Sequence, residues 1–212
     1  MDDNLILIDK PKGITSFDVI RKLKRKYGIK KAGHAGTLDP LATGLLIVAT
    51  GKKTKDISEY VGLPKVYIAE ILIGISTDTY DMEGKVWEDT SVREIDEKNI
   101  LNVLDNFVGV HKISVPIYSA VKVGGETLYK KARRGENVSP PIKEMEVFWI
   151  NLLSHGKEGK YYLLNVKMKV SSGTYIRSLA VEIGKRLGYP ACLKNLRRTE
   201  IGQFMVSDCL SI

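Results

Sequence analysis

The chain has few of the residues from which disulfide frameworks and zinc sites are built. Its 212 residues include only two cysteines and three histidines. Cys192 and Cys209 are too few for a disulfide framework, and no Cys/His spacing resembles a zinc site. We therefore expect both cysteines to be reduced thiols in a cytoplasmic protein.

The sequence patterns of several common enzyme classes are also missing. There is no G-x-S-x-G, Walker loop, G-x-G-x-x-G, H-E-x-x-H or C-x-x-C, which argues against serine-hydrolase, nucleotide-cofactor and zinc-enzyme chemistry. The apolar run after the acidic N-terminal residues is short, so we expect neither a secretory signal nor a membrane span. No repeat, low-complexity run or interdomain linker is visible, and we expect a single domain over residues 1–212.

The positive charge of the chain is unevenly distributed. Residues 1–65 hold 13 Lys/Arg against 7 Asp/Glu, residues 66–110 hold 3 against 10, and residues 111–212 hold 17 against 8. A basic face favours a polyanion, usually a nucleic acid, although a solvated lysine-rich surface is the alternative. Five basic residues fall within positions 21–26, on the outer face of an expected helix, and this density favours phosphate contacts.

Apolar periodicity and turn signals predict more strands than helices. The expected helices end or begin at good capping residues, such as Thr15 or Ser16 before the first helix and Gly28 after it. Expected strands cover residues 5–9, 65–73, 144–153, 161–170, 193–198 and 202–206; expected helices cover 16–27, 53–60, 96–107 and 175–187. Because hairpin-length loops join many strands, we predict an α+β fold with a mixed, largely antiparallel sheet flanked by helices.

Residues 33–46 form a glycine-punctuated loop that runs into an apolar segment. Three glycines bracket His34 and Asp39, a common way to hold a polar side chain against a substrate backbone. From spacing alone, however, Asp39 followed by Pro40 is better explained as the N-cap and first residue of a helix. His34 between two glycines is more often an ordinary loop residue.

Two further positions invite a functional interpretation but are weak signals taken singly. Tyr67 lies in a β-type run, where an aromatic normally belongs to the core or the sheet surface. Arg177 falls at a predicted helix start, where the helix dipole does not favour a cation, so we expect it to have an anionic partner such as a buried aspartate.

Together these segments resemble the TruB family of tRNA pseudouridine synthases. The twelve residues 33–44, Gly-His-Ala-Gly-Thr-Leu-Asp-Pro-Leu-Ala-Thr-Gly, are similar to the family's catalytic motif. Further similar blocks lie before and after this motif, in the family's order, at residues 7–13, 65–67, 77–81, 118–122, 173–177 and 196–198. The resemblance spans roughly residues 5–206, and it implies the pseudouridine synthase fold.

The resemblance implies an isomerase that converts uridine to pseudouridine at position 55, in the T-loop of tRNA. The base would be flipped out of the loop, at a cost of a few kcal/mol, and no cofactor or metal would be needed. Asp39 matches the nucleophile, Tyr67 the residue that stacks on the flipped base, and Arg177 the partner of the aspartate. Substrate-binding positions are matched by His34, Tyr175 and Leu196, and we add Lys10 and Lys122 as phosphate contacts.

The chain departs from the family pattern in two places. Ala35 stands where the family usually has Thr, and bacterial members generally continue into a C-terminal RNA-binding region, often a PUA domain, which we do not expect here.

The predicted partner is the T-arm of tRNA, with no obligate protein partner, no membrane and a monomeric state. Two rival hypotheses are a non-catalytic RNA-binding or RNA-folding protein on this fold and a synthase acting on T-loop-like sites in other RNAs.

Overall fold

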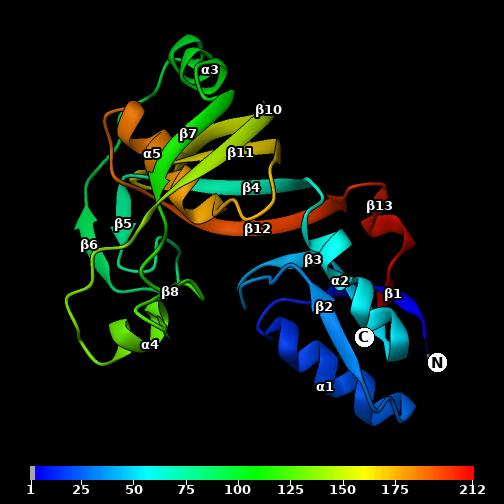
Figure 1. Ribbon diagram of the computed structural model, residues 1–212. Coiled ribbons are helices and arrows are strands. Elements are labelled where there is room, and N and C mark those ends of the chain that lie inside the picture. Colours follow the sequence, from blue (N-terminus) through cyan, green and yellow to red (C-terminus); the bar gives the residue numbers. More distant parts are fainter. Residues whose placement is uncertain (1–2) are drawn as a thin grey trace. The chain divides into compact units, whose positions relative to one another are not determined.

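The computed structural model describes residues 3–212, which divide into two compact units. Unit 1 holds the described residues up to 68, together with 168–173 and 195–212. Unit 2 holds residues 69–167 and 174–194. Three strands contribute residues to both units, namely β4 (Lys65–Ile73), β11 (Tyr161–Val170) and β12 (Ala191–Ile201) (Figure 1).

Unit 1 is built around β1 (Leu5–Lys10) and β3 (Thr43–Thr50), which pair antiparallel. Its strand order is β14-β1-β3-β12, with β2 paired to β3 and β13 to β12. β3 and β12 are parallel neighbours, as are β1 and β14. The remaining elements are α1 (Ser16–Tyr27), β2 (Ala32–Ala35), η1 (Gly51–Asp56), α2 (Ile57–Val61), β13 (Phe204–Met205), η2 (Val206–Asp208) and β14 (Leu210–Ser211).

The alternation of side chains along β1 determines how unit 1 packs. Ile6 and Ile8 face α1, where they join a buried cluster with Val19, Ile20 and Leu23. The intervening residues of β1 pack on the other face, which α2 and β13 cover. Thr15 caps α1 in a reciprocal capping box with Asp18, and Gly28 ends the helix in the left-handed conformation.

Unit 2 has the strand order β4-β11-β10-β7 and carries α3 against β10. The antiparallel pair of β10 and β7 places Met145 opposite His111. Its own elements are β5 (Ile75–Thr77), β6 (Val86–Asp89), α3 (Glu97–Asp105), β7 (Gly109–Ser114), β8 (Lys122–Val123), β9 (Glu126–Thr127), α4 (Leu128–Arg133), β10 (Ile142–Glu158) and α5 (Ile176–Arg186).

The structure confirms the predicted α+β class and its mixed, largely antiparallel sheet. β10 is longer than the strand predicted over 144–153, because it continues to Glu158, and the chain then turns at Gly159 in a left-handed conformation. The helix predicted over 53–60 is instead a 3-10 turn, η1, followed by the short α2. A hairpin at Gly124 and Gly125 joins β8 to β9, with both glycines at positive φ.

Candidate active site

The segment between β2 and β3 carries Asp39 and belongs to unit 1. Asp39 and Pro40 do not begin a helix, so the helix-cap explanation is wrong. The backbone N–H of Ala42 donates to the carbonyl of Asp39 at 3.0 Å, which closes a turn. The chain then enters β3, where pairing with β1 and β12 imposes extended backbone. Asp39 is therefore the first residue of a tight turn, with Pro40 and Leu41 at its tip.

Contacts from the start of α1 and from the turn that precedes it hold both sides of the turn at Asp39. The buried hydroxyl of Ser16 accepts from the Leu38 N–H at 2.9 Å and donates to the Leu38 carbonyl at 3.2 Å. On the other side of Asp39, the Gly13 N–H donates to the Pro40 carbonyl at 2.8 Å. The residues before and after Asp39 are thus fixed to a capped helix and to the turn that precedes it.

Lys10, which we expected at a phosphate, lies in the interior. Its side chain has no exposed area, and its Nζ donates to the carbonyls of Pro11 at 2.9 Å, Ile14 at 2.7 Å and Pro40 at 3.4 Å. A buried ammonium with these donors occupied is poorly placed to reach a phosphate at the surface. Lys10 instead ties the 11–14 turn to the turn that carries Asp39.

Tyr67 and Leu196 lie on adjacent strands of the same unit. Tyr67 is on β4 and Leu196 on β12, and each is 7% exposed. The Tyr67 hydroxyl lies 3.5 Å from Nη1 of Arg198, which is also on β12. The phenol is thus tied to a buried guanidinium through its hydroxyl.

His34 lies on β2, opposite Val48 of β3, close to the start of the Asp39 segment. Burial, and then the positive charge of Arg198, lowers the pKa of His34 below its usual value. The buried Nδ1 atom has no hydrogen-bond partner among residues 3–212. We therefore expect a neutral imidazole at physiological pH that keeps one unsatisfied polar atom.

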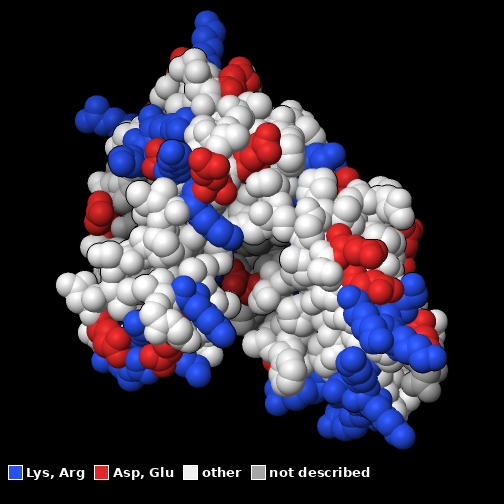
Figure 2. Space-filling view, in the orientation of Figure 1, with Lys and Arg blue, Asp and Glu red and all other residues white. Residues whose placement is uncertain are grey.

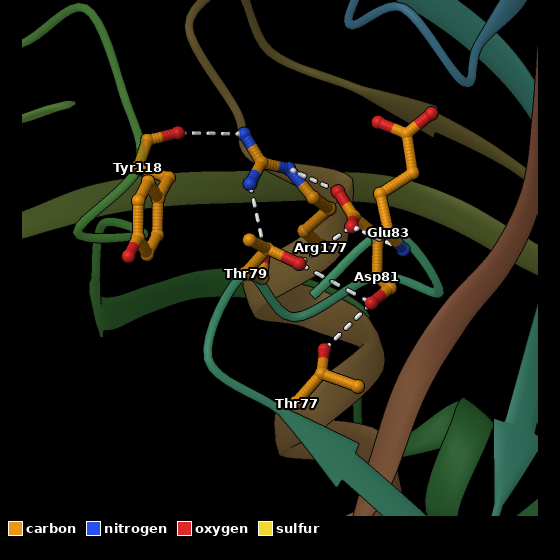
Figure 3. Close-up of polar contacts among 6 residues, drawn as sticks. All are labelled: Thr77, Thr79, Asp81, Glu83, Tyr118 and Arg177. Carbon is orange, nitrogen blue, oxygen red and sulfur yellow. Dashed lines mark hydrogen bonds and ion pairs between the residues drawn. The ribbon is translucent and has the colours of Figure 1, made fainter. Parts of the chain in front are cut away.

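Arg177 lies in the first turn of α5, in unit 2, with its side chain 6% exposed (Figure 3). Its guanidinium donates to the carbonyls of Thr79 at 2.7 Å and Tyr118 at 3.1 Å. Nε lies 3.7 Å from a carboxylate oxygen of Asp81, whose side chain is equally buried. Asp81 is thus the buried anionic partner that the position of Arg177 at a helix start predicts.

Asp81 is not among the predicted site residues, although it lies in the block 77–81 that resembles the family. Its carboxylate accepts from the Thr79 hydroxyl at 2.6 Å and from the Glu83 N–H at 3.1 Å. Figure 3 shows the Asp81 carboxylate between these local donors and the guanidinium of Arg177. The signal that could have identified Asp81 is its place in a short turn rich in Thr and Asp, which binds a carboxylate through local donors.

The remaining predicted residues of unit 2 lie on two other elements. Tyr175 is the N-cap residue of α5, and its side chain is half-buried. Lys122 is exposed on β8.

Within residues 3–212, no cluster of three His, Cys, Asp or Glu side chains could hold a metal ion. In the same range, no helix has the length and apolar character required to cross a bilayer.

Comparison with known proteins gives consistent matches over most of the chain. Residues 24–176 match the family described as TruB family pseudouridylate synthase (N terminal domain). The chain is 46% identical to tRNA pseudouridine synthase B of Fusobacterium nucleatum, over 95% of this chain and 69% of that protein. It is 41% identical to the protein of the same name from Aquifex aeolicus, over 99% of this chain and 72% of that one.

Solved structures give the same fold. A Cbf5-Nop10-Gar1 complex contains a chain that is 28% identical, with a TM-score of 0.72, over 98% of this chain and 52% of that one. An H/ACA RNP bound to a substrate RNA containing 2'-deoxyuridine contains one at 27% identity and a TM-score of 0.71, over 98% and 50%. The chain therefore spans about half the length of these structural neighbours, and it has the predicted pseudouridine synthase fold.

Proposed function

Because this chain belongs to the TruB family of pseudouridylate synthases, we propose that it is a tRNA pseudouridine synthase that acts on the uridine at position 55 of the T-loop. Both units together would form one catalytic domain. The two relatives with this activity in their names match nearly the whole chain. The turn that carries Asp39 lies within the matched residues and is held from both sides, as a reactive carboxylate requires.

The reaction rearranges bonds within the substrate. The bond from the ribose C1′ to N1 of uracil breaks, the base rotates, and C1′ bonds to C5. The proton leaves C5 and N1 gains a proton, so the product is an isomer of the substrate. Neither an oxidant nor a second substrate is consumed. What the protein must supply is a nucleophile, a pocket for the detached base and a route for one proton.

In the proposed mechanism the Asp39 carboxylate is the nucleophile, and the bond that it forms to the substrate breaks again before the product leaves, which regenerates the carboxylate. Tyr67 stacks on the flipped uracil, and Leu196 lines the base pocket from the neighbouring strand. Stacking on an aromatic ring stabilises a base by ~1–3 kcal/mol, which offsets much of the few kcal/mol that base flipping costs. His34 lies at the entrance of the Asp39 segment, where a neutral ring can fill the space that the flipped nucleotide leaves.

We also propose roles for residues of unit 2. Arg177 would act in catalysis, as the family resemblance implies, and the Asp81 carboxylate supports it by keeping its guanidinium oriented. Tyr175 would contact the base, and the exposed Lys122 a phosphate. The Asp81 carboxylate, which is removed from water, needs this cation, because an unpaired buried charge costs several kcal/mol.

The phosphates of the T-arm would bind to the exposed face of α1. Arg21, Lys22, Arg25 and Lys26 are all exposed on this helix, and Figure 2 shows the positive side chains gathered over it. Lys22 and Arg25 also line a surface groove of about 500 Å³ with Ile14. We propose that the enzyme works in the cytoplasm as a monomer and needs no protein partner.

The observation that carries the proposal is the held turn at Asp39, within a family match of 153 residues from 24 to 176. Its test is incubation of the protein with total RNA, followed by mapping of pseudouridine at single-nucleotide resolution. We expect new pseudouridine at position 55 of tRNAs. Modification confined to messenger or ribosomal RNA would reassign the substrate, and no new pseudouridine in any RNA would contradict the enzymatic function.

A further inference from the structure

Arg198 is almost entirely buried, yet it forms no ion pair among residues 3–212. The residue as a whole is 1% exposed to solvent. Nη2 donates to the carbonyl of Gly36 at 3.0 Å, and Nε donates to the carbonyl of Leu45 at 2.8 Å. Nη1 lies 3.5 Å from the Tyr67 hydroxyl. One guanidinium therefore contacts three separate segments of unit 1.

The two carbonyls mark the two ends of the segment that carries Asp39. Gly36 directly follows β2, and Leu45 is the third residue of β3. The third contact, Tyr67, is the proposed stacking residue. Arg198 thus connects the start and the end of the Asp39 segment to the aromatic ring that would receive the base.

A close approach of β12 and β3 at Gly44 explains how the Arg198 side chain reaches both ends of the Asp39 segment. In the parallel pair of β12 and β3, Arg198 lies opposite Gly44. Gly44 has a φ of +104°, and a Cβ atom there would lie 2.2 Å from the backbone oxygen of Arg198. Glycine is therefore required for this close approach. The approach brings the arginine next to the Leu45 carbonyl.

Stability alone does not explain a buried cation at this position. A buried charge is costly, and an apolar side chain of similar volume often stabilises a fold at least as well. A second buried cation, Lys65, lies close enough that the charge of Arg198 contributes to the lowering of the Lys65 pKa. The fold retains Arg198 despite this repulsion. A planar guanidinium spreads five N–H donors over three nitrogens in a fixed geometry and so reaches acceptors on widely separated segments, whereas a lysine carries its three donors on one nitrogen.

We propose that Arg198 is a positioning residue of the active site, which holds both ends of the Asp39 segment and the Tyr67 hydroxyl in one rigid frame. The proposal rests on the proposed function only for its effect on catalysis. The geometric part, that Arg198 immobilises residues 36–45, stands by itself and can be measured without substrate.

Two variants test the proposal, Arg198→Lys and Arg198→Gln. Lysine keeps the charge but not the planar set of donors. Glutamine is neutral and keeps one donor group, so it remains informative if the lysine variant does not fold. The matched control is Arg197→Lys at the next residue, whose partly exposed guanidinium pairs with Asp9 at 2.7 Å.

The first readout is hydrogen exchange followed by mass spectrometry on the free protein. We expect faster exchange confined to peptides covering residues 36–45 in both Arg198 variants. The second is the single-turnover rate at saturating T-arm stem-loop RNA, together with the Kd for that RNA. Since a 1 Å misplacement of reacting groups costs on the order of 100-fold, we expect the rate to fall by about 30- to 100-fold. The Kd of both Arg198 variants should differ from that of the wild type by less than about threefold, as should the Kd of the Arg197→Lys control.

Different results separate the possible failures. Faster exchange throughout β1, β3 and β12 would assign Arg198 a general structural role and overturn the proposal. Unchanged exchange at residues 36–45, or a rate equal to that of the Arg197→Lys control, would overturn it as well. If the wild type forms no pseudouridine, the proposed function fails, while the exchange data still decide whether Arg198 immobilises the segment.

Discussion

The hydroxyl of Ser16 offers a direct test of how the turn at Asp39 is held. Ser16 is 1% exposed, and its hydroxyl makes two hydrogen bonds to the backbone of Leu38, the residue before Asp39. Replacement by alanine removes one oxygen atom and keeps the helix-forming backbone of α1. The Leu38 N–H then loses its partner in a position that is closed to water.

The expected cost follows from this lost partner. A buried N–H left without an acceptor costs about 1–3 kcal/mol. In a chain of this size each kcal/mol lowers the melting temperature by about 2–4 °C. We therefore expect Ser16→Ala to lower the Tm by about 2–12 °C. Because the freed segment adjoins Asp39, the single-turnover rate on a T-arm stem-loop should fall by about tenfold.

Thermal unfolding and the single-turnover rate are measured in parallel with Ser207→Ala as the control. Ser207 is exposed, and its hydroxyl donates to the carboxylate of the adjacent Asp208 at 3.1 Å. A surface substitution of this kind should change stability by less than about 0.5 kcal/mol. If Ser16→Ala behaves like the control in both assays, the Ser16–Leu38 contacts do not hold the turn and the reasoning is refuted.

Three other perturbations test separate parts of the account. Asp81→Asn removes the buried negative charge beside Arg177 and should lower the free energy of unfolding by about 3 kcal/mol in a denaturant titration. Lys22→Gln combined with Arg25→Gln should weaken RNA binding and reduce the slope of log Kd against log salt by about 1.5. Burial, and then Arg198, lowers the pKa of Lys65 to about 8 from 10.5. The unfolded chain therefore binds more protons between these pH values, and stability should rise with pH from 8 to 10.5 more steeply than in Lys65→Gln.

Each of these three predictions has its own contradicting result. An Asp81→Asn protein of unchanged stability would mean that the ion pair with Arg177 contributes nothing. For the salt dependence, Lys98→Gln with Lys143→Gln removes two exposed charges from unit 2, and an equal change of slope would remove the special role of α1. Parallel pH curves for wild type and Lys65→Gln would show that Lys65 has its ordinary pKa.

Much of the local structure could be predicted because it depends on neighbours in the sequence. The capping of α1 by Thr15 and Gly28 and the N-cap at Asp96 follow from short-range rules, and the structure confirms them. The turn at Asp39 could not be predicted from spacing. Its conformation is imposed by strand pairing and by Ser16, which is 22 residues away from Leu38.

The roles of individual charged residues could not be predicted from the sequence either. Lys10 was expected at a phosphate because it is charged, but the carbonyls around it are brought together only by the fold. Arg198 gave no signal as a positioning residue, because its partners come from three segments that are distant in the sequence. Asp81 became visible only when α5 brought Arg177 to its turn.

The role of Asp39 is tested by comparing the wild type with Asp39→Asn on one T-arm stem-loop RNA. Pseudouridine formation and RNA affinity are measured on the same preparations. We predict complete conversion by the wild type, no turnover by Asp39→Asn, and Kd values that agree within about threefold, because the substitution leaves the phosphate contacts in place. Near-normal pseudouridine formation by Asp39→Asn would contradict the assignment of Asp39 as the nucleophile.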